Sequence, residues 1–154
     1  MPPRVDPAPT AAFTAAAAAL ARSFASSPPS SSAPSDAELD LAFHRAADEL
    51  LGNLQDAVEA WGEDADVPDF DYGVSDGVAS ISLGPDAGTY VINKQGPNRQ
   101  IWMSSPVSGP LRYDYDAEKK AWVYRRDGHL FHERLRSELV AVGGGELDLE
   151  GLNE

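Results

Sequence analysis

The chain has 154 residues, of which 42% are hydrophobic and 24% charged, an ordinary composition for one globular domain. Its 25 acidic and 12 basic side chains give a formal net charge of −13, which argues against partners such as nucleic acid and anionic lipid. Cysteine is absent, which excludes disulfides, thiolate metal sites and a cysteine nucleophile. No apolar run approaches the roughly 20 residues that cross a bilayer, so a membrane-spanning protein is not expected.

Residues 1–34 have the composition of a targeting segment. They carry Arg4 and Arg22 against one acid, an alanine-rich run, and serine and proline clusters. Arginine- and serine-rich, acid-poor N-termini are typical of organellar transit peptides, and we expect cleavage near Phe24/Ala25. The alternative interpretation is a disordered tail with no targeting role.

The folded domain is expected over residues 35–152, and it begins with a helix. Ser35 and Glu38 fit a capping box, in which each side chain satisfies a backbone donor of the other residue. The residues that follow place apolar side chains three or four positions apart, which predicts one buried stripe. The stripe comprises Leu39, Phe43, Ala47, Leu50, Leu54, Val58 and Trp61.

The opposite face of this helix is strongly acidic. Residues 36–76 contain thirteen acids and a single base, Arg45. Iron(II), calcium and magnesium accept carboxylate oxygens, so this face is a candidate cation-binding surface, although the pattern by itself is more typical of an ordinary solvated helix face. Unmatched charges repel one another, and this cost favours the functional interpretation. Asp40 and His44, one helical turn apart, form a weaker candidate pair for a cation.

Beyond the helix the hydrophobic period changes to two. Six strands are expected, separated by Gly-, Pro-, Asp- and Asn-rich turns whose short lengths imply an antiparallel sheet. These strands are residues 69–74, 78–83, 89–94, 99–104, 111–115 and 121–124. A last helix over about 130–142 turns Phe131, Leu135, Leu139 and Val142 to one side, and an acidic, leucine-bearing tail follows it. The fold class is therefore α+β, an α–β sandwich with two helices on one face of the sheet.

The middle of the sheet has the side chains of a protein interface. Amides, cations and a large aromatic gather between residues 93 and 112, and Trp and Arg are enriched at interface hot spots. Because Ile101 and Met103 are the better core candidates, alternation turns Trp102 to the open face; the alternative is that Trp102 and Trp122 are both buried. No nucleophile–base set or phosphate-binding glycine loop is evident, so enzyme chemistry finds little support.

Residues 88–106, GTYVINKQGPNRQIWMSSP, closely resemble the central strands of the frataxin family. The resemblance continues through residues 108–114 and 122–128 and extends over about 36–149. It implies a protein of the mitochondrial matrix; whether the transit segment also reaches a plastid, in a photosynthetic source, is left open by the sequence. Frataxins join a cysteine desulfurase and an iron–sulfur scaffold protein and promote sulfur transfer. They also bind iron weakly, and the family is described as an iron chaperone, a ferroxidase or an iron store.

The resemblance assigns two sets of residues by position. The acidic ridge, expected to bind iron, comprises Asp48, Glu49, Asp56, Glu59, Asp69 and Asp71. The partner-facing sheet comprises Asn93, Lys94, Gln95, Asn98, Gln100, Trp102, Arg112 and Trp122. A monomer is expected, with iron-dependent oligomers as the alternative. Ala60 interrupts the ridge, and Arg126 stands where some relatives have histidine, so the iron stoichiometry stays open.

Overall fold

The computed structural model describes residues 33–153. The chain divides into two units, Met1–Pro34 and Ser35–Glu154, and the second carries the fold. The expected transit segment and its cleavage site lie outside the described residues. The elements, in chain order, are α2 (Asp36–Asp64), β1 (Phe70–Ser75), β2 (Val78–Leu83), α3 (Gly84–Ala87), β3 (Thr89–Gln95), β4 (Gln100–Ser105), β5 (Gly109–Asp116), β6 (Ala121–Tyr124), α4 (Phe131–Gly143) and η1 (Glu150–Asn153).

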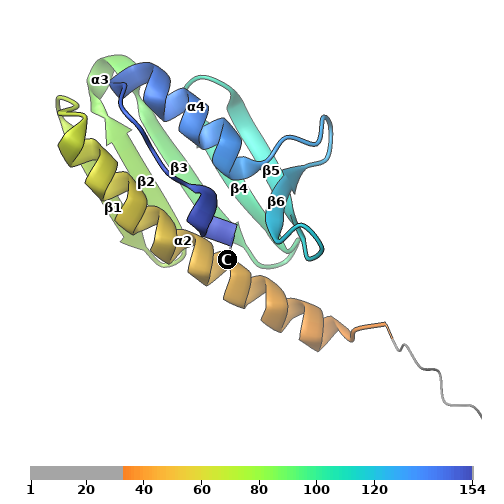
Figure 1. The fold of residues 1–154 in the computed structure, drawn as a ribbon. Helices are drawn as coiled ribbons and strands as arrows, with labels where there is room; N and C mark the ends of the chain where they lie inside the picture. Colours follow the sequence, from red (N-terminus) through yellow and green to blue (C-terminus); the bar gives the residue numbers. More distant parts are fainter. Residues whose placement is uncertain (1–32, 154) are drawn as a thin grey trace, which may run out of the picture. The chain divides into compact units, whose positions relative to one another are not determined.

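The strands form one six-stranded sheet in sequence order, and each is antiparallel to the next. Helices α2 and α4 lie on the same face of this sheet (Figure 1). The predicted α+β sandwich and its antiparallel sheet are therefore confirmed. The other sheet face carries no element of the described chain, and this face holds much of the candidate site.

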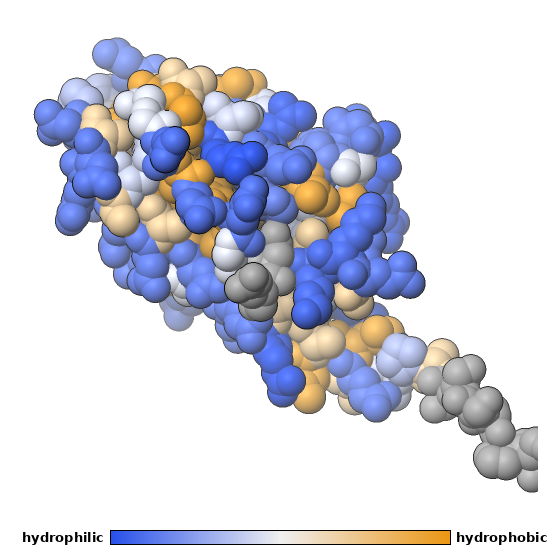
Figure 2. All heavy atoms as spheres, in the orientation of Figure 1, coloured by the Kyte–Doolittle hydropathy of each residue, from blue (hydrophilic) through white to orange (hydrophobic). Residues whose placement is uncertain are grey.

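Helix α2 begins as its sequence predicts. The Ser35 hydroxyl accepts from the Glu38 amide at 3.3 Å, and the Glu38 carboxylate accepts from the Ser35 amide at 2.7 Å. Burial on α2 starts only at Phe43, so the expected core position of Leu39 is wrong: its side chain is 38% exposed because the first turns receive little cover from the sheet. Figure 2 shows hydrophobic residues gathered around these turns. Val142, in the last turn of α4, is likewise exposed rather than buried.

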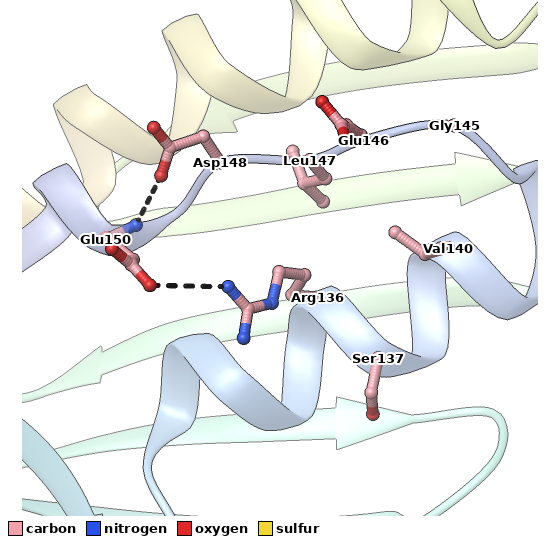
Figure 3. Close-up of a pocket in the computed structure, with 8 residues that line it drawn as sticks. All are labelled: Arg136, Ser137, Val140, Gly145, Glu146, Leu147, Asp148 and Glu150. Carbon is pink, nitrogen blue, oxygen red and sulfur yellow. Dashed lines mark hydrogen bonds and ion pairs between the residues drawn. The ribbon is translucent and has the colours of Figure 1, made fainter.

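The expected trailing tail is also wrong, because residues 146–152 pack back onto the domain. This segment runs between α2 and α4 (Figure 1) and buries Leu147, Leu149 and Leu152. Polar contacts hold its end: Arg136 Nη1 lies 3.7 Å from Glu150 Oε1, and the Glu150 amide donates to Asp148 Oδ1 at 2.9 Å (Figure 3). The segment therefore completes the helix layer.

A buried carboxylate joins α4 to the sheet. The Glu138 side chain accepts from the Tyr90 hydroxyl at 2.9 Å, from the Ser105 hydroxyl at 2.6 Å, and from the Ser108 hydroxyl. Burial and the hydrogen bond to Glu138 raise the pKa of Tyr90 well above its usual value. The sequence indicated no partner for these two serines, because Glu138 lies about thirty positions further along the chain. The cluster fixes the β4–β5 turn against α4.

Glu138→Gln is expected to lower the free energy of unfolding by about 1–3 kcal/mol, because an amide cannot accept from all three hydroxyls. Urea unfolding followed by far-UV circular dichroism measures the change. Glu133→Gln, on an exposed position of the same helix, is the matched control and should change stability by less than about 0.5 kcal/mol. Equal effects of the two substitutions would contradict a structural role for the buried cluster.

Candidate functional site

The open face of the sheet carries a cross-strand row of three side chains. Asn93 pairs with Trp102 across β3 and β4, and Trp102 pairs with Arg112 across β4 and β5. Directly paired residues share a face, and their strand neighbours Ile92 and Met103 are buried on the opposite face beneath the helices. The structure therefore places Trp102 on the open face, as alternation predicts. Gln95 and Gln100 pair with each other on the same face.

Trp102 is held in place by two neighbours. Its indole Nε1 donates to Gln100 Oε1 at 2.9 Å, and the Arg112 guanidinium carbon lies 4.5 Å from the ring centroid. A cation over an indole face is an attractive arrangement. A hollow of about 300 Å³ opens beside the ring, with Val91 and Leu111 in its lining. The arrangement offers a fixed aromatic surface, a cation and an apolar recess to a partner.

Two residues of the predicted partner face lie elsewhere. Lys94 alternates with Asn93, so it faces the helices, and its Nζ lies 2.7 Å from Asp48 Oδ1. Trp122 is 2% exposed, with its ring 5.9 Å from Phe43 and 5.1 Å from Tyr115 between centroids. Trp122 pairs with Tyr115 on the helix-facing side of β5 and β6, so its expected exposure to a partner is wrong. Asn98 is exposed in the turn after β3.

The acidic ridge is spread over two elements. Asp48, Glu49 and Asp56 are exposed on α2, and Glu59 is half-buried. Asp56 and Glu59 lie close enough to Tyr72 of β1 to act on its ionisation: burial raises the pKa of Tyr72 to about 12, and the two carboxylates add to the shift. Asp69 and Asp71 are exposed at the start of β1, with Asp71 alternating to the side away from the helices.

Within residues 33–153, no three or more Asp, Glu or His side chains converge as a group that could hold a metal ion. Asp40, expected to share a cation with His44, instead accepts from Arg99 Nε at 2.6 Å. Arg99 also lies 3.3 Å from Asp36, so the β3–β4 turn is tied to the first turns of α2. Arg99 is one of the cations between residues 93 and 112 that the sequence placed in the predicted interface, and the unmatched acids of α2 were the signal for this ion pair. The ridge carboxylates are mostly exposed, and within residues 33–153 they do not converge on one point.

No helix of residues 33–153 is long and apolar enough to cross a membrane.

Comparisons with known proteins all point to the same protein family. The frataxin-like domain family matches residues 37–145. "Frataxin, mitochondrial" of Arabidopsis thaliana is 43% identical over 107 residues, covering 70% of this chain and 57% of the relative. The Dictyostelium discoideum protein of the same name is 47% identical over 97 residues, covering 63% and 50% respectively. The matched part of the chain thus spans about half the length of these relatives.

Solved structures agree with the fold. The yeast Saccharomyces cerevisiae frataxin, crystallised as a trimer complexed with ferrous iron, is 36% identical with a TM-score of 0.57, covering 77% of this chain and 94% of its own. The frataxin of Psychromonas ingrahamii is 23% identical with a TM-score of 0.58, covering 71% and 95%, and it supports the fold alone.

The names of the relatives confirm the mitochondrial localisation expected from the sequence. The matched residues span α2 to the end of α4, and they include both the acidic helix and the open sheet face. The chain belongs to the frataxin family.

Proposed function

We propose that the chain is an activator of a cysteine desulfurase–scaffold complex in the mitochondrial matrix, and that its open sheet face docks on that complex to promote sulfur transfer. Frataxins are associated with iron–sulfur cluster assembly and with iron binding. The observation that carries the proposal is the Trp102 arrangement: a large aromatic, fixed by Gln100 and Arg112, stands on a face that no element of residues 33–153 covers.

The Trp102 side chain is preorganised for docking by Gln100 and Arg112. Trp and Arg side chains dominate the energetics of interfaces, and an aromatic that is already held loses little side-chain entropy on docking. The charge distribution supports oriented encounter, because residues 36–76 carry thirteen acids and one base whereas residues 77–136 carry six acids and nine bases. Without cysteine, the chain supplies no sulfur ligand of its own, which fits an assisting role rather than a scaffold role.

The test is the rate of sulfide production and of cluster formation by a matched desulfurase–scaffold complex, with and without the full chain, at fixed iron. We expect acceleration that saturates with chain concentration. A rate that does not change over the whole concentration range would refute the activator role and leave iron handling as the function to pursue.

The second candidate function is loose binding and delivery of Fe²⁺ on the acidic ridge, as an iron chaperone. The ferrous complex of the yeast relative favours it. A ferroxidase is the weaker form of this candidate, because the ridge within residues 33–153 shows no converging ligand set that would protect a redox site. An iron store would instead form iron-dependent oligomers, which light scattering detects.

The triple substitution Asp56→Asn, Glu59→Gln and Asp69→Asn is expected to weaken Fe²⁺ binding about tenfold, because iron meets fewer anionic oxygens. Anaerobic titration calorimetry measures the affinity. The matched control removes three exposed acids elsewhere, as Glu118→Gln, Glu133→Gln and Glu146→Gln, and should leave most of the affinity intact. Equal losses in both variants would show that net charge, and not the ridge, attracts iron. An unchanged rate of iron oxidation in air would eliminate the ferroxidase.

A further inference from the structure

The open face continues beyond Arg112 into a second hollow, of about 460 Å³. Its charged lining consists of Arg112, Arg125, Arg126 and Asp114. Three arginines and one aspartate therefore line the same hollow, in a chain whose formal net charge is −13. The contacts of each arginine show whether its positive charge is already matched by an acid of the chain.

Only one of the three arginines is paired with an acid. Arg125 Nε lies 2.7 Å from Asp114 Oδ2, and Asp114 Oδ1 accepts from Gln100 Nε2 at 3.2 Å. Arg112 stacks on Trp102, and within residues 33–153 neither Arg112 nor Arg126 forms an ion pair or a hydrogen bond with a carboxylate. Two guanidinium groups in the hollow are thus available to an anion from outside.

The cationic hollow adjoins the apolar hollow beside Trp102. Pro110 and Arg112 line both, so the two recesses meet along the start of β5. One side of the shared boundary offers Val91, Leu111 and the Trp102 ring, and the other offers unpaired guanidinium groups. An occupant that fills both must carry apolar and anionic groups a few ångströms apart.

We propose that the two hollows together bind a segment of a partner protein in which an apolar side chain stands next to one or two carboxylates. A phosphate fits the site less well, because the hollow is built from strands and a loop, without the helix N-terminus or glycine-rich backbone donors that cradle phosphate. The planar fork of arginine matches a carboxylate with two parallel hydrogen bonds. The apolar hollow selects a peptide over a free anion.

This inference deepens the proposed function and rests on it in one respect, namely that a protein covers the open face. It adds the chemistry of the segment that docks there. It also assigns a role to Arg126, which the sequence considered only as a replacement for histidine at a metal site, and to Arg125 and Asp114, which hold Gln100 and through it the Trp102 indole.

The experiment is a titration of the full chain with a blocked peptide of sequence Gly-Ser-Leu-Asp-Asp-Ser-Gly, followed by NMR of backbone amides, arginine Nε–H groups and the indole N–H groups. We expect shifts concentrated at Trp102, Arg112 and Arg126. The same peptide with both aspartates replaced by asparagine should bind at least about fivefold more weakly, and added salt should weaken the aspartate peptide.

Arg126→Gln is expected to reduce the affinity for the aspartate peptide about three- to fivefold, since an exposed ion pair contributes modestly. Arg45→Gln makes the same charge change on an exposed position of α2 and should leave the affinity unchanged. Equal affinity for the aspartate and asparagine peptides would overturn the proposal, as would inorganic phosphate that shifts the same signals at lower concentration. Peptide binding without stimulation of the desulfurase would refute the proposed function alone; stimulation without peptide binding would refute this inference alone.

Discussion

Trp102→Ala should abolish most of the stimulation of the desulfurase–scaffold complex, with a loss of about thirtyfold or more in apparent affinity, while the domain stays folded. Truncation of a hot-spot tryptophan costs about 2 kcal/mol or more of binding free energy. The substitution leaves the core intact, because the side chain lies on the open face and contacts Gln100 and Arg112 rather than the helix layer. The sulfide production rate as a function of chain concentration measures the loss.

Two further variants make this result specific. Trp102→Phe keeps an aromatic face for Arg112 but removes the indole donor to Gln100, so it should retain part of the stimulation. Leu41→Ala removes a large apolar side chain that is 60% exposed on α2, and it should stimulate as the unaltered chain does. Circular dichroism melts establish that all three variants are folded. Full stimulation by a folded Trp102→Ala chain would show that the open face is not the docking surface.

Some carboxylates of the acidic ridge lie in structural surroundings that account for their charge without iron. Strand β1 is an edge strand whose one sheet partner within residues 33–153 is β2, and Asp69 and Asp71 lie just before and within its first two residues. Charged side chains on an edge strand discourage pairing with another chain. Asp48 is engaged by Lys94 at 2.7 Å. Asp56 and Glu59, three positions apart in the second half of α2, both lie near Tyr72, and the iron test therefore centres on them.

Local patterns predicted the elements well, because each depends on neighbours in the chain. Strands β2 to β5 alternate between a buried and an open face, and the Ser35–Glu38 capping box is complete within four residues. The same alternation placed Trp102 correctly, since Ile101 and Met103 on either side are buried. Alternation could not place Trp122, because Ala121 and Trp122 are both buried in the short strand β6. A two-residue period therefore does not show which face of the sheet each side chain of β6 occupies.

Local patterns could not predict contacts between residues that are far apart in the sequence. Arg99 contacts Asp40, which lies 59 positions earlier in the sequence. Which acid pairs with Arg99 depends on how α2 crosses the β3–β4 turn. The arginine hollow combines side chains from β5 and from the loop after β6. Leu147, Leu149 and Leu152 follow neither a helical nor a strand period, so their burial depends on the gap that α2 and α4 leave between them.

Leu149→Ala is accordingly expected to destabilise the domain by about 2–4 kcal/mol, because it leaves a cavity at a side chain that is 1% exposed between the two helices. This is a large share of the roughly 5–15 kcal/mol that stabilises a typical domain. Urea unfolding followed by tryptophan fluorescence measures the change, since Trp61 donates to the Gly144 carbonyl at 3.0 Å near the start of the C-terminal segment.

Leu41→Ala is the matched control for Leu149→Ala, because it removes the same side chain from an exposed position and should change stability by less than about 0.5 kcal/mol. Similar losses in the two variants would contradict the burial of the C-terminal segment. The folded fraction of Leu149→Ala should still stimulate the desulfurase normally, because the segment packs on the helix side of the sheet and Trp102 lies on the other. Stability and docking are thus separable on opposite faces of one sheet, and the two alanine substitutions, at Leu149 and Trp102, should each affect only one of them.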